Sequence, residues 1–136
     1  MKLLASTDFA VRLLMLLAHR GGEGPLSVEM LSRELGGLSR HHLHKIVQNL
    51  ASMGLVETLR GAGGGVLLAK KPEDIRIGSL LAALEEDCAL VECFREDGAC
   101  TLMPVCRLKG FLGTARRNFY RELDQRTIAD CLPLKK

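Results

Sequence analysis

The chain has 136 residues, of which 47% are hydrophobic and 26% are charged, with four Phe, one Tyr and no Trp. This length suits a single domain, the hydrophobic fraction excludes a wholly disordered chain, and a composition poor in aromatic residues favours helices. The net charge of +3 is too small to indicate a partner. The longest apolar run near the start, residues 13–18, is too short for a membrane span or a signal peptide, so we expect a cytoplasmic protein with no membrane partner.

The first predicted helix covers residues 7–19. Ser6 or Thr7 is expected to cap it, and Asp8 lies in its first turn, where the helix dipole favours a carboxylate. Gly21, Gly22, Gly24 and Pro25 then end the helical pattern.

Two further helices are predicted before residue 54. Ser27 caps the second, which ends near Leu35, and Ser39 caps the third. The expected inward residues of the second helix are Val28, Leu31 and Leu35. Those of the third step by three and four positions: Leu43, Ile46, Val47, Leu50 and Met53.

Two short runs of strand-like residues, 56–60 and 66–69, surround a glycine-rich stretch and predict a β-hairpin. Helices followed by a turn, a helix and a hairpin make a winged helix-turn-helix. The predicted fold class is therefore mainly α with a small hairpin wing. We expect this DNA-binding domain to cover residues 1–72.

The second half is predicted to contain a short helix over residues 77–86 and an irregular segment over 87–106. A long helix follows over residues 105–124, and Thr127 is expected to cap a last turn. We expect residues 73–104 to form one part, which carries the cysteines, and residues 105–136 to form another. One stripe of the long helix has no obvious mate within the chain, which predicts that the helix pairs with a second copy in a homodimer. This stripe consists of Leu108, Phe111, Leu112, Ala115 and Phe119.

Charge is distributed in blocks. Residues 39–71 carry five basic residues, one acidic residue and three His, whereas residues 72–97 carry eight acidic and two basic residues. The third helix has no acidic residue, follows a glycine turn and precedes the wing, which together favour DNA binding over a merely solvated polar face. The glycine-rich tip is not a nucleotide-binding loop, because no Gly-Lys-Ser/Thr follows it. The predicted DNA contacts are Ser27, Ser39, Arg40, His41, His42, His44, Lys45, Gln48, Arg60 and Gly63.

Cys93, Cys100 and Cys106 are separated by six and five residues. Thiolates are soft ligands suited to zinc or iron–sulfur clusters, but the paired Cys-x-x-Cys motifs typical of zinc sites are missing. Spacing alone leaves two interpretations open: a metal or cluster site, and ordinary core or redox-active cysteines.

The chain resembles the Rrf2 family of bacterial winged-helix repressors over nearly its whole length. The matching stretches are TDFAVR (7–12), LSRHHLHKIV (38–47), GLV (54–56), RGAGGGV (60–66), IRIG (75–78) and PVCRL (104–108). The resemblance implies a cysteine loop that holds an iron–sulfur cluster and is followed by a dimerisation helix.

Two branches of this family differ in their ligands. The branch that regulates cluster biogenesis has a histidine three residues after the last loop cysteine, where this chain has Lys109. Resemblance to the branch that senses nitric oxide implies that Cys93, Cys100 and Cys106 bind the cluster, with Asp8 contributed by the partner protomer. It implies a 4Fe–4S cluster, with 2Fe–2S as the alternative. Asp8 has a simpler alternative role as an ion-pair partner of Arg12, and Cys88 is a possible replacement ligand.

The sequence thus predicts a repressor that binds a double-stranded DNA operator in a cluster-dependent way and senses nitric oxide. An iron-status or redox regulator of the same family is one alternative. Another, from a different class, is a small metal or cluster carrier whose basic helix binds a protein partner. No nucleophile–base constellation is present, so we do not expect an enzyme.

Overall fold

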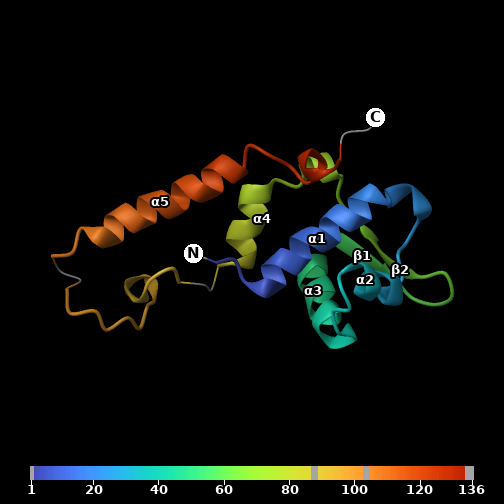
Figure 1. Ribbon diagram of the computed structural model, residues 1–136, viewed down its shortest axis with the longest axis horizontal. Helices are drawn as coiled ribbons and strands as arrows, with labels where there is room; N and C mark the ends of the chain where they lie inside the picture. Colours follow the sequence, from blue (N-terminus) through green and yellow to red (C-terminus); the bar gives the residue numbers. More distant parts are fainter. Residues whose placement is uncertain (1, 87–88, 103–104, 134–136) are drawn as a thin grey trace.

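The computed structural model describes residues 2–86, 89–102 and 105–133 (Figure 1). The α-helices and strands are α1 (Ala5–His19), α2 (Val28–Glu34), α3 (Arg40–Ser52), β1 (Val56–Leu59), β2 (Gly65–Leu68), α4 (Ile77–Leu84) and α5 (Leu108–Leu123). Short 3-10 helices cover Gly21–Glu23, Pro72–Asp74, Glu92–Phe94 and Ala129–Cys131. Figure 1 shows α1–α3 and the hairpin in one winged body, with α4 beside it. Helix α5 extends away above residues 89–102, which carry Cys93 and Cys100 and are called the cysteine segment below.

The predicted start of the first helix is wrong. Helix α1 begins at Ala5, Leu4 occupies the N-cap position without a side-chain cap, and Thr7 lies inside the helix at 1% exposure. The reason is a tertiary contact: the Leu4 N–H donates to Glu85 Oε1 at 2.9 Å. This acceptor replaces the local cap and lets the helix start earlier in the chain.

The predicted caps of α2 and α3 are confirmed. The Ser27 hydroxyl accepts from the Met30 N–H, and the Ser39 hydroxyl accepts from the His42 N–H, both at 3.2 Å. Val28 is not an inward residue, because it is 37% exposed at the first position of α2. Leu26 fills the core instead, since its backbone pairs with Val66 in an isolated antiparallel β-bridge beside the hairpin.

The hairpin is antiparallel, with Val56 opposite Leu68 and Leu59 opposite Gly65. Gly65 has a φ of +153°, and a Cβ there would lie 2.6 Å from the Leu26 carbonyl carbon. Only glycine lets the backbone of Leu26 approach this closely. The wing is thereby fixed to the segment that leads into α2.

The core lies between α1, α2, α3 and the hairpin. Leu13, Leu31, Leu43 and Leu50 are fully buried in it, and Ile128 joins them from the far end of the chain. The buried positions of α3 are Leu43, Ile46, Val47 and Leu50, as its periodicity predicts, with Met53 partly buried.

Helix α5 is attached to the body through its C-terminal end. The Asp124 carboxylate accepts from both the N–H and the hydroxyl of Ser79 at 2.7 Å, and so caps α4 from another helix. The Ile128 N–H donates to the Ile75 carbonyl at 2.9 Å.

No residue of α5 itself is buried. The helix predicted over residues 105–124 begins later than expected, at Leu108.

Within the described ranges, no helix combines the length and the hydropathy that a bilayer crossing requires.

Candidate DNA-reading surface and cysteine segment

Helix α3 buries its apolar face and presents its polar face to solvent. The side chains predicted to contact DNA are all exposed: Ser39, Arg40, His41, His42, His44, Lys45 and Gln48, together with Ser27 at the start of α2. The amino end of α3 projects from the winged body (Figure 1), as insertion into a DNA groove requires. This arrangement can offer donors to phosphates and base edges.

The Ser39 cap also orients the first turn of α3. The Ser39 hydroxyl lies 3.1 Å from His42 Nδ1 and accepts from the His42 backbone N–H as well. Arg40 pairs with Glu29 of α2, but both side chains are more than two-thirds exposed, so the pair contributes little and can exchange for a phosphate. Lys45 makes no ion pair among the described residues.

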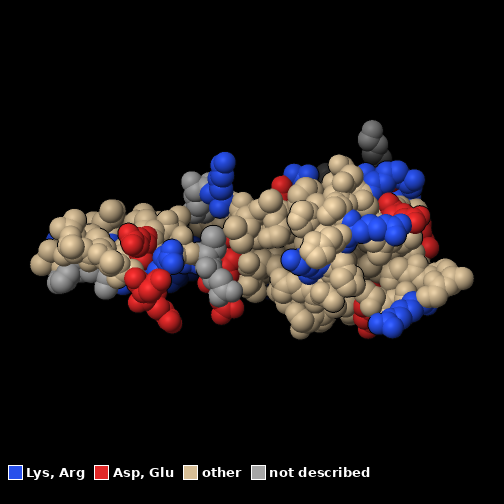
Figure 2. All heavy atoms as spheres, turned by 90° about the horizontal axis from the view of Figure 1, so that it is seen from below, with Lys and Arg blue, Asp and Glu red and all other residues tan. Residues whose placement is uncertain are grey.

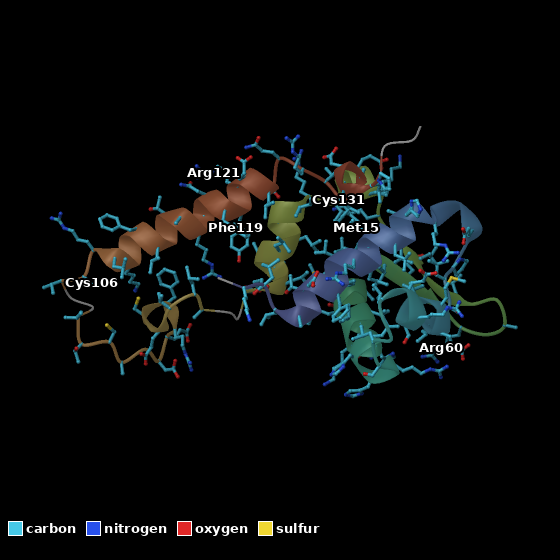
Figure 3. The ribbon with its side chains drawn as sticks, viewed as in Figure 1. Met15, Arg60, Cys106, Phe119, Arg121 and Cys131 are labelled. Carbon is cyan, nitrogen blue, oxygen red and sulfur yellow. The ribbon has the colours of Figure 1, made fainter. Side chains whose placement is uncertain are left out.

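Arg60 is exposed at the far end of the hairpin (Figure 3), and Gly63 is exposed in the loop between the two strands. Arg60 directly follows β1, and the hairpin holds it on the same body as α3. Figure 2 shows several Lys and Arg side chains on this winged half, with a few Asp and Glu side chains among them, and side chains of both signs on the extension that carries the cysteines.

Three thiols of the cysteine segment are half-buried and free. These are Cys93 and Cys100 in the segment and Cys106 just before α5 (Figure 3). The segment packs against α5: the Cζ atom of Phe94 lies 3.9 Å from the position that a Cβ would take at Gly113. Free, partly accessible thiols suit soft metals and clusters as donors. However, the described residues contain no group of three ligating side chains close enough to hold a metal ion. Cys88 lies outside the described residues.

Asp8 is engaged within its own helix. Its carboxylate accepts two hydrogen bonds from the Arg12 guanidinium, at 2.9 and 2.8 Å, and both side chains are about half exposed. This is the simpler contact that the spacing of the two residues predicts. An exposed ion pair of this kind costs little free energy to break, so a metal cation can replace Arg12 as the partner of the Asp8 carboxylate.

Cys131 has a different environment. It lies in the last 3-10 helix, where burial, followed by the neighbouring Asp130 charge, raises the pKa of its thiol. Since the thiolate is the metal ligand and the nucleophile, a raised pKa makes this cysteine less suited to either role.

Sequence reasoning missed Glu85. Its side chain is 4% exposed and holds the start of α1. No local pattern could have revealed this contact, because its partner Leu4 lies 81 residues away.

Comparison with known proteins places the chain in a family. The chain matches the profile of the Rrf2 family, described as an iron-dependent transcriptional regulator, over residues 3–133. It is 41% identical over 133 residues to the HTH-type transcriptional regulator NsrR of Halalkalibacterium halodurans, covering 97% of this chain and 90% of that protein. It is also 40% identical over 138 residues to NsrR of Bacillus subtilis, covering 100% and 93% of the two chains.

Solved structures agree with these relatives. T. potens IscR has a TM-score of 0.75 at 27% identity, over 96% of this chain and 85% of that one. CymR, the global cysteine regulator of B. subtilis, has a TM-score of 0.73 at 28% identity, over 96% and 95%. The winged-helix prediction is confirmed, and so is the prediction that the chain is not an enzyme, since these relatives are transcriptional regulators. The chain belongs to the Rrf2 family of transcriptional regulators and is similar to NsrR.

Proposed function

We propose that this chain is a homodimeric repressor whose affinity for a DNA operator depends on an iron–sulfur cluster and is abolished by nitric oxide. The observation that carries the proposal is the set of three free, half-buried thiols between α4 and the exposed helix α5, in a chain of an iron-dependent regulator family. The similarity to NsrR supports the nitric oxide branch of this family.

The DNA-reading part of the proposal rests on α3 and the wing. Lys45 and the three histidines of α3 are exposed beside a helix face that has no acidic residue, and Arg60 is exposed on the wing. A double-stranded operator can then be contacted by α3 in the major groove and by Arg60 at the minor groove.

The dimer rests on α5. Leu108 and Phe111 are 57% and 67% exposed, and Val105 just before the helix is 80% exposed. Apolar side chains clustered at this exposure are typical of a protein interface. A second copy that covers them places two winged domains on the two half-sites that helix-turn-helix dimers read.

Cys93, Cys100 and Cys106 would hold the cluster, and Asp8 of the partner would complete it. When bound, the cluster supplies iron at which nitric oxide reacts. Asp8 is the weakest of the four proposed ligands, because a carboxylate oxygen is a harder donor than a thiolate. Asp8 would therefore be the ligand that is lost most easily, and its loss would free the cysteine segment of one protomer from α1 of the other. The spacing of the two α3 helices would change as a result.

Absorption spectra of anaerobically reconstituted protein test the cluster. We expect visible bands in the wild type and in Cys131→Ala, which serves as the matched control because its thiol is less suited as a ligand. The bands should disappear in Cys93→Ala, Cys100→Ala and Cys106→Ala and weaken in Asp8→Ala. A Cys100→Ala protein that keeps the wild-type spectrum would contradict the ligand set.

Electrophoretic shifts with the cluster-loaded protein test the DNA surface. Lys45→Ala and Arg60→Ala should weaken binding, with the salt slope falling by about one for each lost phosphate contact. A protein that takes up a cluster but shows no salt-dependent, sequence-selective shift would instead be a carrier.

A further inference from the structure

Glu85 is a buried carboxylate that the proposed function does not use. It directly follows α4, is 4% exposed, and forms no ion pair with any Lys or Arg among the described residues. Its one hydrogen bond in the described part of the chain is the Leu4 N–H donated to Oε1 at 2.9 Å. Burying a carboxylate is costly unless the charge gains a partner, so this hydrogen bond compensates for the burial.

The contact leads directly to Asp8. Leu4 is the N-cap residue of α1, and its carbonyl accepts from the Asp8 N–H at 3.0 Å. The Leu4 peptide units thus join Glu85 on one side to the backbone of Asp8 on the other. In sequence, Glu85 lies at the base of the cysteine segment, eight residues before Cys93.

The residues that lead into α1 are not tightly packed beside Glu85. A cavity of about 190 Å³ adjoins Glu85 and is lined by Leu3, Leu90, Arg116 and Tyr120, among others. Leu3 and Leu4 are 40% and 43% exposed. Packing of the buried Thr7 holds one side of the first turn, and the Glu85 hydrogen bond is the polar contact that fixes Leu4 at the start of this turn.

We propose that Glu85 is a positioning residue that ties the base of the cysteine segment to the turn of α1 that carries Asp8. A displacement of the cysteine segment then moves Asp8, and a displacement of Asp8 moves the segment. This inference rests on the proposed function, in which Asp8 is a ligand. Asp8 serves the cluster of the partner, whereas Glu85 adjoins the cysteines of its own chain. The contact therefore connects the two cluster sites of the dimer.

The first experiment measures amide hydrogen exchange of the cluster-free protein by NMR. In Glu85→Ala the amides of Leu4 and Asp8 should exchange at least about tenfold faster, as expected for the loss of a hydrogen bond to a charged group. Glu85→Gln keeps an acceptor oxygen and should restore most of the protection. The control is Glu86→Ala, the exposed neighbour, which should leave exchange unchanged. Wild-type exchange at Leu4 in Glu85→Ala would overturn the proposal.

A second variant removes the same hydrogen bond from the donor side. Leu4 has φ −59° and ψ 144°, which proline adopts without strain, so Leu4→Pro deletes the N–H and keeps the backbone path. Glu85→Ala and Leu4→Pro should each speed exchange at Asp8, and the double variant should be no faster than the faster single variant. Additive effects would show that the two residues act separately.

The third measurement follows cluster loss to a chelator. Glu85→Ala should lose its cluster at least about tenfold faster than the wild type, and Glu85→Ala combined with Asp8→Ala should lose it no faster than Asp8→Ala alone. Loss at the wild-type rate in Glu85→Ala would refute the coupling. A wild-type protein that takes up no cluster would refute the proposed function and the coupling with it, whereas amide exchange would still decide whether Glu85 holds the turn.

Discussion

Replacing Gly78 with Ala tests how α5 is held to the winged body. Gly78 lies in α4 where the end of α5 crosses it, and a Cβ at this position would lie 2.6 Å from both the Cβ and the N of Asp124, with the Tyr120 carbonyl closer still. Helix propensity alone favours Ala over Gly by about 1 kcal/mol. The clash outweighs this gain, because most of the blocking atoms are backbone and cannot rotate away.

The magnitude follows from what must move. Overpacking costs about 1–3 kcal/mol, and separating the helices also weakens the two Ser79 hydrogen bonds to the Asp124 carboxylate, each about 1–2 kcal/mol. Against the propensity gain, we expect the free energy of unfolding to fall by about 3 kcal/mol. The melting temperature should fall by about 10 °C in calorimetry.

Gly22→Ala is the matched control. Gly22 has no atom within 4 Å of an added Cβ and no positive φ, so we expect a change of less than about 1 kcal/mol. A Gly78→Ala protein as stable as the wild type would refute the close crossing of α4 and α5.

Three further predictions follow from the fold. Ser39→Ala removes the cap of α3 and should lower the free energy of unfolding by about 1 kcal/mol in urea titrations, and an unchanged midpoint would contradict the cap. Hydrogen bonds from Ser79 lower the pKa of Asp124 below its usual 3.8, so its contribution to stability is present above that value and is lost as the pH falls through the lowered pKa. Asp124→Asn should therefore flatten the acid side of the stability profile, and a profile identical to that of the wild type would disprove this role. Phe111→Glu combined with Leu112→Glu places charges in the proposed α5 interface and should give monomers in sedimentation, whereas a persistent dimer would exclude that interface.

Local chemistry explains why much of the winged half could be predicted from the sequence. Ser27 and Ser39 cap helices with their own hydroxyl groups, and the 3.6-residue period of α3 determines which residues are buried and which are exposed. These interactions involve residues three or four apart, which a sequence pattern reveals directly.

Contacts between distant segments could not be predicted in the same way. The start of α1 depends on Glu85, and the cap of α4 depends on Asp124, 45 residues after Ser79. Leu26 replaces Val28 in the core because the backbone of Leu26 pairs with Val66 of β2. Each outcome depends on a tertiary contact that no local period encodes.

The residues of the candidate site also fall into two groups, those predictable from local pattern and those that depend on distant segments. Exposure of the α3 side chains follows from helix geometry, so the sequence could predict that the residues proposed to contact DNA lie on the surface. The relation between Cys93, Cys100 and Cys106 depends on an irregular segment, and the role assigned to Asp8 depends on a second chain. A single protomer instead pairs Asp8 with Arg12.

The most direct test of the account is the affinity of the cluster-loaded dimer for its operator, measured by fluorescence anisotropy before and after stoichiometric nitric oxide. Cluster-free protein serves as the reference at the same salt concentration, because DNA affinity depends strongly on salt. We predict tight binding by the loaded protein, weak binding by the cluster-free protein, and release of DNA on addition of nitric oxide. Equal affinity of the loaded and cluster-free proteins, with no response to nitric oxide, would contradict the account.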